Sequence, residues 1–384
     1  MNFSIGYIDD ENALEKAIST LEKCEVIYID LEFDKNHFRY GFNLCLMQIF
    51  DGETCFLIDP LGNISIEKIF PVLENSEIEK VCFAFGEDMR LLHHIGCFPK
   101  NVLDLAVVRS LLGKPTLSMS NTLVEELGLE AQKSQQKSNW FSRPLKAEQI
   151  QYAAEDVVDL PKLREVLMTE LSKMNREEWI QQEMTQFEKE DWSKEGGAEA
   201  VPLKDRKLLT MRQWIRYSLI MEYRDYLSSK LNRPSYKVIE KSIFLDLAKS
   251  PKNVEKWTKM KRVHPKIRNE KVKQKLIELL KEAEEIIKNE EIKEDESSRP
   301  KITREEKIIH SQLRKKIDYE KDNIFQPIKE KMKEDYGESF TNFLLSNRRI
   351  VGIVSGNIEL LPYQKKLLEH YSKALQVPLS NGYT

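Results

Sequence analysis

The sequence Val-Ile-Tyr-Ile-Asp-Leu-Glu-Phe occupies residues 26–33 and decides how the first part of the chain folds. A run this rich in β-branched and apolar side chains predicts a strand buried on both faces. Because alternate side chains of a strand share a face, Asp30 and Glu32 lie about 7 Å apart on one side. Two buried carboxylates need a cation, and the run contains no Lys or Arg. Their oxygens suit Mg²⁺ or Mn²⁺; the alternative, common for an isolated Asp-x-Glu, is a solvated strand end.

Length and composition indicate a water-soluble protein of two or three domains. The chain has 384 residues, of which 41% are hydrophobic and 32% are charged. No apolar run is long enough to span a membrane and the first residues do not begin a signal peptide, so we expect a cytoplasmic protein. The five cysteines form no Cys-x-x-Cys pair, and we expect them to be reduced residues of the core.

The net charge of -3 conceals a strong asymmetry along the chain. Residues 1–168 contain 16 basic and 27 acidic residues, a net charge of -11, whereas residues 205–288 contain 22 basic and 11 acidic residues, a net charge of +11. This division predicts an acidic domain and a basic domain that binds phosphates. The alternative is that the basic helices only keep the surface soluble.

The hydrophobic pattern predicts an α/β domain followed by helical domains. Strands and helices alternate after a hairpin that turns at Asp51-Gly52, which implies a mixed sheet covered by helices. We expect strands at 26–33, 43–50, 54–58, 80–84 and 101–104, and helices at 11–23, 65–74, 87–94, 104–112 and 146–173. Linkers are predicted at 188–204 and 289–300, and they divide the chain into domains at residues 1–187, 205–288 and 301–384.

Three further residues can join the two carboxylates of the central strand. Asp88 lies at the start of a predicted helix, after a short strand, where it can face the edge of the sheet. Tyr152 and Asp156 are four residues apart on a later predicted helix and therefore share a face. Each residue has an ordinary alternative. Asp88 is a typical helix-start carboxylate, and the later helix can carry one buried Tyr and one solvated Asp.

Taken together and in this order, these residues resemble the three exonuclease motifs of the ribonuclease D family, the DEDD 3′→5′ exonucleases with Tyr in the third motif. The matching residues are Asp30-Leu31-Glu32, Asp88, Arg143-Pro144-Leu145, Gln149, Tyr152-Ala153-Ala154 and Asp156. The resemblance covers about residues 20–170 and implies an α/β ribonuclease H-like fold with two divalent metal ions, Mg²⁺ or Mn²⁺. By position, it assigns Asp30, Glu32, Asp88 and Asp156 as metal ligands and Tyr152 as the residue that positions the attacking water.

The chemistry of such a site agrees with the residues present. Two metal ions can activate water and stabilise the leaving oxygen in phosphodiester hydrolysis, and four carboxylates are enough to hold them. The sequence contains no Gly-x-Ser-x-Gly motif and no phosphate-binding Gly loop. Two departures from the family pattern are modest. Lys146 stands where a helix-capping Thr or Ser is common, and Phe85-Gly86 precedes the second motif where a His is common.

Residues 206–288 resemble, less closely, the HRDC module found after the exonuclease domain in ribonuclease D and in RecQ-type helicases. The matching features are Trp214, Tyr223, Arg224, Arg233-Pro234, Val238-Ile239, residues 244–248, Ser250-Pro251 and Trp257, whereas the usual later Gly is absent. A dense run of basic residues follows, and contact with phosphates is its most economical use. Our candidates for nucleic-acid binding are Lys256, Lys259, Lys261, Arg262, Lys266 and Arg268, together with Arg143. We expect the apolar residues among them to form the helical core and not to stack on bases.

The sequence therefore predicts an α/β ribonuclease H-like exonuclease domain followed by one or two all-α HRDC-like domains, the second of them degenerate. The function that this predicts is a monomeric 3′→5′ exoribonuclease that trims RNA, with tRNA precursors as the expected substrate. The choice of RNA comes from the resemblance alone. Two alternatives remain: a DNA 3′→5′ exonuclease in repair, and an inactive nucleic-acid-binding protein that keeps the nuclease fold.

Overall fold

The computed structural model describes residues 3–130, 135–192, 201, 203–299 and 303–379. These residues form two compact units, which we describe separately. The first unit contains the described residues of 1–32, 44–193 and 303–384, and the second contains those of 33–43 and 194–302. Within the described residues, no helix is both long and apolar enough to cross a membrane.

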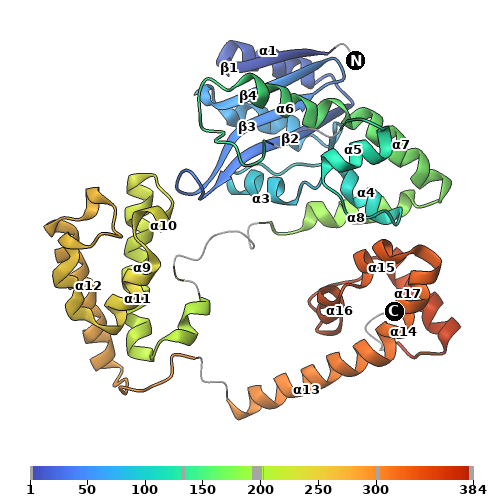
Figure 1. The fold of residues 1–384 in the computed structure, drawn as a ribbon. Coiled ribbons are helices and arrows are strands. Elements are labelled where there is room, and N and C mark those ends of the chain that lie inside the picture. Colours follow the sequence, from blue (N-terminus) through green and yellow to red (C-terminus); the bar gives the residue numbers. More distant parts are fainter. Residues whose placement is uncertain (1–2, 131–134, 193–200, 202, 300–302, 380–384) are drawn as a thin grey trace. The chain divides into compact units, whose positions relative to one another are not determined.

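A six-stranded sheet with the order β1-β4-β3-β2-β5-β6 organises the first unit (Figure 1). The strands are β1 (Ser4–Asp10), β2 (Val26–Lys35), β3 (Phe42–Phe50), β4 (Thr54–Asn63), β5 (Glu79–Cys82) and β6 (Val102–Asp104). β4 pairs parallel with β1 and antiparallel with β3, and β5 pairs parallel with β2 and β6. The predicted mixed sheet is therefore confirmed, with the Asp-Leu-Glu strand at its centre.

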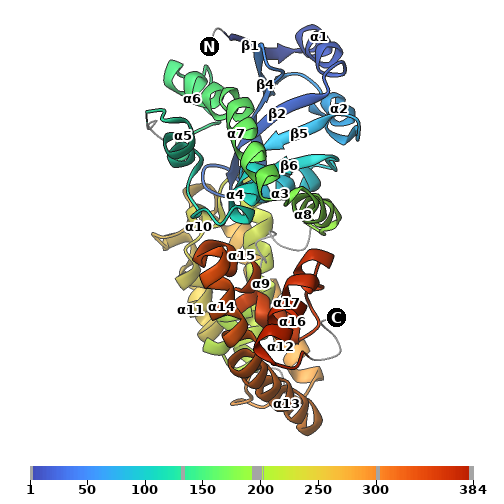
Figure 2. The ribbon, with the colours of Figure 1, turned by 90° about the vertical axis from the view of Figure 1, so that its right-hand side faces the viewer.

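Helices of the first unit cover the sheet. They are α1 (Glu11–Leu21), α2 (Phe70–Glu74), α3 (Gly86–His94), α4 (Leu105–Leu111), α5 (Met119–Leu127), α6 (Ala147–Val158), α7 (Leu160–Lys173) and α8 (Glu177–Lys189). α6 packs against β4 and α7 against β5, and Figure 2 shows both helices over one face of the sheet. Ala153 and Ala154 of α6 are fully buried, and their small side chains allow α6 to approach the strands closely.

Several elements differ from the sequence prediction, and helix α8 is one that was not predicted. The single helix expected at 146–173 is two helices, because Pro161 has no N–H to continue the hydrogen-bond ladder and lies in the first turn of α7. Strand β1 was not predicted; Gly6 and the acidic residues at its end weaken its strand pattern. Helix α5 was not predicted either, although Ser118 caps it and Gly128 ends it in the left-handed conformation.

Residues 303–379 add five helices to the first unit: α13 (Arg304–Glu320), α14 (Gln326–Tyr336), α15 (Glu338–Leu345), α16 (Asn347–Val354) and α17 (Pro362–Leu375). Their apolar residues and those of α4 to α8 form one continuous hydrophobic core. Tyr363 of α17 stacks on Trp179 of α8, with 4.9 Å between ring centroids and 17° between ring planes. The Tyr363 hydroxyl also donates to the carboxylate of Glu183. The helical content is as predicted, but the sequence did not indicate this shared core.

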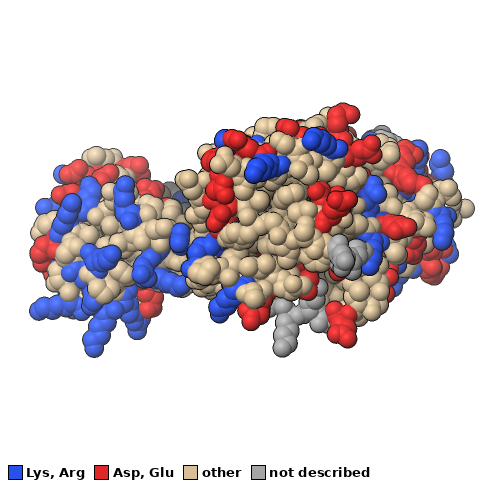
Figure 3. All heavy atoms as spheres, turned by 90° about the horizontal axis from the view of Figure 1, so that it is seen from above, with Lys and Arg blue, Asp and Glu red and all other residues tan. Residues whose placement is uncertain are grey.

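The second unit is helical. Its main elements are α9 (Met211–Leu231), α10 (Ser235–Val238), α11 (Lys241–Lys249) and α12 (Glu270–Asn289), with short 3₁₀ segments at Pro251–Lys259 and Pro265–Ile267. A hydrophobic core lies between α9, α11 and α12, and the fully buried Trp257 donates its indole N–H to the Ile267 carbonyl at 2.8 Å. On the face seen in Figure 3, Lys and Arg side chains gather over this unit, at the left.

Candidate active site

Strand β2 and helix α6 bring three of the predicted carboxylates together. One oxygen from each of Asp30, Glu32 and Asp156 lies within 4.8 Å of the others. Glu32 is 8% exposed and Asp156 is 9% exposed, so water screens their charges poorly. The strand alternation of β2 and the position of α6 over the sheet are therefore sufficient to build this cluster.

Burial and mutual repulsion raise the pKa values of the carboxyl groups in this cluster. Desolvation, followed by the charge of Asp88, raises the pKa of Asp30 well above its usual range. Desolvation and the neighbouring carboxylates raise the pKa of Glu32 in the same way. The pKa of Asp156 rises to about 8 through desolvation and the charge of Asp30. The groups that shift these pKa values are themselves acids, so the site lacks a compensating positive charge of its own.

Asp88 lies in the first turn of α3, 8% exposed, and burial raises its pKa to about 8. Its oxygens are outside the group of three that lie within 4.8 Å, but its charge acts on both Asp30 and Glu32. Asp88 is thus a neighbour of the cluster, and it comes from a third element of the fold.

A second buried acid, Asp104 at the end of β6, holds the turn that leads to Asp88. Its carboxylate accepts the backbone N–H groups of Ala84 at 2.8 Å and Phe85 at 2.9 Å, and it caps α4 through Ala106. Ala84 takes a left-handed φ of 56°, a conformation that this clamp supports. We did not identify Asp104 from the sequence. Its position at the end of a predicted strand, on the edge of the sheet that carries Asp88, was the available signal.

Tyr152 lies one turn before Asp156 on α6, as the spacing predicted, and the two side chains share a hydrogen bond. Burial and the charges of Asp156, Glu32 and Asp30 raise the pKa of the Tyr152 phenol. The phenol therefore stays protonated at neutral pH, so that it can donate a hydrogen bond but cannot act as a base. Trp140 lies beside it, with ring centroids 6.3 Å apart.

Arg143 immediately precedes α6, and all five of its N–H groups are directed at acceptors in the protein. Nε and Nη2 donate to Asp59 of β4 at 2.5 and 2.6 Å, Nη2 also donates to the Cys45 carbonyl of β3, and Nη1 donates to the Trp140 and Ser142 carbonyls. A guanidinium has five N–H donors, so none is left for a phosphate. Arg143 anchors the start of α6 to the sheet and does not present itself to a nucleic acid.

Lys146 offers no capping side chain at the start of α6, and Gln149 forms hydrogen bonds there with the Lys146 backbone. The Lys146 backbone N–H donates to Oε1 of Gln149 at 3.2 Å, and the backbone N–H of Gln149 donates to the Lys146 carbonyl at 3.0 Å, so both ends of the first turn are paired. This contact, together with the Arg143 anchor, fixes the helix that carries Tyr152 and Asp156.

The six basic candidates of the second unit lie along one stretch, 256–268, in the 3₁₀ segments and the turn between them. Lys256, Lys259, Lys261 and Lys266 are exposed. Arg262 is exposed too, and it pairs with Glu240 at 2.9 Å. Arg268 is only half-buried. The structure therefore leaves most of these cations accessible to a polyanion.

Comparison with known proteins assigns the first part of the chain to a class. Residues 5–172 match the family model described as 3′-5′ exonuclease. Part of the chain is similar to ribonuclease D of several bacteria. It is 34% identical over 181 residues to ribonuclease D of Zymomonas mobilis, covering 46% of each chain, and 26% identical over 259 residues to that of Bartonella henselae, covering 64% of this chain and 61% of the relative. The matches thus span about half to three fifths of these relatives.

The crystal structure of Escherichia coli RNase D has the same fold. It superposes with a TM-score of 0.69 at 21% sequence identity, covering 97% of this chain and 99% of that chain. The predicted ribonuclease H-like exonuclease fold with a helical C-terminal region is confirmed. Exonuclease domains of this kind use divalent metals. The group of possible ligands fits such ions, because it consists of the carboxylate oxygens of Asp30, Glu32 and Asp156.

Proposed function

We propose that this protein is a metal-dependent 3′→5′ exoribonuclease that removes nucleotides from RNA ends by hydrolysis. The observation that supports it is the cluster of Asp30, Glu32 and Asp156, which brings three carboxylates within 4.8 Å of one another inside an exonuclease domain. Such a cluster is unfavourable on its own and becomes favourable when divalent cations bind.

In this proposal, Asp30, Glu32, Asp88 and Asp156 hold two divalent ions, Mg²⁺ or Mn²⁺. When bound, the ions would lower the pKa of water and neutralise charge on the scissile phosphate. Tyr152 donates its protonated hydroxyl within the cluster and positions the attacking water beside Asp156. Asp104 and Arg143 act indirectly, since they hold the elements that carry these residues.

The proposed substrate is RNA, with tRNA precursors as the expected class. Escherichia coli RNase D, whose fold the chain shares, is described as an exoribonuclease involved in structured RNA processing. The net charge of +11 over residues 205–288 supports a polyanionic partner, and the exposed lysines at 256–266 are its proposed contacts.

The test is digestion of a 5′-labelled tRNA precursor with a 3′ extension, in Mg²⁺, in Mn²⁺ and in chelator. We expect products that shorten one nucleotide at a time from the 3′ end, and no products in chelator or with Asp156→Asn. A single-stranded DNA of the same sequence serves as the comparison. Faster digestion of the DNA would replace RNA by DNA as the substrate, and label released from the 5′ end would reject the proposal.

A further inference from the structure

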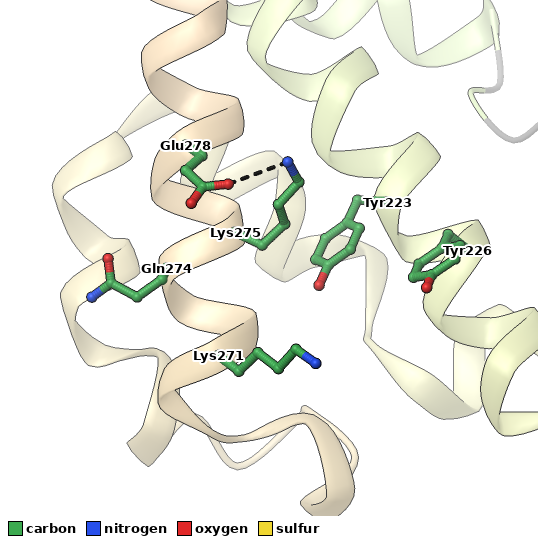
Figure 4. A pocket seen from close by; sticks show the side chains of 6 residues that line it. All are labelled: Tyr223, Tyr226, Lys271, Gln274, Lys275 and Glu278. Carbon is green, nitrogen blue, oxygen red and sulfur yellow. Dashed lines mark hydrogen bonds and ion pairs between the residues drawn. The ribbon is translucent and has the colours of Figure 1, made fainter.

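The second unit contains a groove between α9 and α12 that the proposed catalytic chemistry does not use. It has a volume of about 620 Å³ and is lined by Tyr223, Tyr226, Lys271, Gln274, Lys275 and Glu278. Figure 4 shows the two tyrosines on one helix and the charged side chains on the other. The groove contains none of the six basic candidates at 256–268, although Lys271 and Lys275 continue the same basic run of the sequence.

The two tyrosines lie with their rings nearly parallel. They are three residues apart on α9, with 5.9 Å between ring centroids and 14° between ring planes. Tyr223 packs against the helical core, whereas Tyr226 is 53% exposed. An exposed ring stacked on a fixed one offers a flat apolar surface that water covers poorly. Trp257 is fully buried, in line with the expectation that apolar residues of this region form the helical core, whereas Tyr226 is exposed.

Three lysines lie near these rings, together with Glu278. In Figure 4, the Lys271 ammonium points from α12 toward the tyrosines. Lys275 lies one turn further along and pairs with the exposed Glu278 at 3.2 Å, an interaction that solvent weakens and a phosphate can replace. On α9, the Lys230 ammonium lies 5.5 Å from the centroid of the Tyr226 ring.

We propose that this groove binds a single-stranded segment of a polynucleotide, with a base stacked on Tyr226 and the adjacent phosphates on Lys271 and Lys275. Every base has a flat π-face, so stacking on tyrosine with nearby lysines holds a strand without reading its sequence. The net charge of +11 over residues 205–288 favours a polyanion over other ligands. The choice of RNA as the strand rests on the proposed function. The groove contains no residue of the carboxylate cluster.

The experiment measures binding to the full chain carrying Asp156→Asn, in chelator, so that the RNA stays intact. The probes are fluorescein-labelled oligo(A), oligo(U) and oligo(dA) of about 12 nucleotides, within the range of known single-strand sites. We expect Tyr226→Ala to weaken oligo(A) binding about 5- to 150-fold, the range given by stacking of one base. Tyr226→Phe keeps the ring and should bind within about twofold of the parent.

A matched control tests whether the loss of any exposed tyrosine would weaken binding. Tyr319 of α13 is 64% exposed and lies outside the groove, so Tyr319→Ala should leave oligo(A) binding unchanged. Equal affinity of the Tyr226→Ala and Tyr319→Ala proteins would overturn the proposal. Equal losses in Tyr226→Ala and Tyr226→Phe would do so as well, because the ring face would then not be the cause. Comparison of oligo(A) with oligo(dA) tells whether the groove prefers RNA.

The lysines are tested by salt dependence. Changing both Lys271 and Lys275 to Gln should reduce the slope of log K against log[salt] by about 1.4, since each phosphate contact on a single strand contributes about 0.7. Lys281→Gln, on the exposed side of α12 outside the groove, should leave binding within about twofold, since a distant charge is screened. An unchanged slope in the double variant would overturn the phosphate assignment. These measurements need no hydrolysis, so they remain informative even if wild-type protein failed to digest RNA.

Discussion

The carboxyl groups of the candidate active site repel one another, so we expect the stability of the folded protein to depend on pH and on metal ions. The pKa values of Asp88 and Asp156 rise from 3.8 to about 8 in the folded chain, mainly through desolvation. Between about pH 4 and pH 8 the folded chain therefore holds protons that the unfolded chain has released. Stability then falls as the pH rises through this window, because the unfolded state binds fewer protons.

We predict that Asp156→Asn raises the melting temperature of the metal-free protein at about pH 8 and changes it little at about pH 5. The substitution removes one charge that repels Asp30, and it also abolishes RNA hydrolysis. Melting curves in chelator at both pH values test this, and Mg²⁺ should stabilise the wild type more than the variant. A variant that melts below the wild type at about pH 8 in chelator would contradict the assignment of a repulsive cluster.

Tyr152 gives a second prediction for single residues. Because its phenol is held protonated as a donor, Tyr152→Phe should lower the hydrolysis rate by about 10²–10⁴-fold, the contribution typical of a positioned acid–base group. RNA affinity should be unchanged, since the hydroxyl acts on the water and not on the strand. Single-turnover rates and separate binding measurements distinguish the two effects. A normal rate would make Tyr152 a core residue only.

The sequence correctly predicts which side chains share a face where the strand or helix repeat alone determines it. Asp30 and Glu32 share a face because strands alternate, and Tyr152 and Asp156 share a face because they lie one helical turn apart. Arg143 was predicted to bind nucleic acid, whereas the structure pairs it with Asp59 of β4, which lies 84 residues away in the sequence. No local pattern shows such a partner, so the role of a surface-like Arg could not be predicted.

At the scale of elements, the contact between Asp59 and Arg143 connects the sheet to the start of α6. We predict that Asp59→Asn destabilises the protein by about 1.5–3 kcal/mol, the range for hydrogen bonds to charged groups. It should also lower kcat more than it raises KM, because α6 carries Tyr152 and Asp156 but not the binding surface. Denaturant unfolding and steady-state kinetics measure the two effects.

Glu53→Gln is the matched control for this prediction. Glu53 is an exposed acid in the β3–β4 turn, and its substitution removes the same charge without touching α6. Both stability and kcat should stay close to wild type in this control. If Asp59→Asn behaved like Glu53→Gln, the Arg143 contacts would not position the helix.

The sequence predicts an element well where the signal lies within that element. It fails where contacts between distant parts of the chain determine the element. The break between α6 and α7 at Pro161 could have been predicted from the missing N–H alone. Strand β1 depends on parallel pairing with β4, about 50 residues away, which no local pattern encodes. The packing of residues 303–379 against α8 could not be predicted either, because an apolar helix face does not show which helix will cover it.

For the whole molecule, the uneven distribution of charge predicts a division of labour between catalysis and binding. Changing Lys256, Lys259, Lys261 and Lys266 to Gln together in the full chain should weaken structured RNA binding. The slope of log K against log[salt] should fall by about 0.7–0.9 for each phosphate that the variant no longer neutralises. The weakening should be nearly independent of RNA sequence, and the rate at saturating RNA should be unchanged. A lower rate at saturation would mean that these lysines act in catalysis instead.

The stacking of Tyr363 on Trp179 has a consequence for how the protein is made. The ribosome completes α8 long before it reaches α17, which lies more than 170 residues later. At about 5–20 residues per second, roughly 10–40 s pass between the two. Throughout that interval the α8 surface around Trp179 lacks the helix that will cover it. The apolar surface of α8 therefore stays uncovered until α17 has been synthesised.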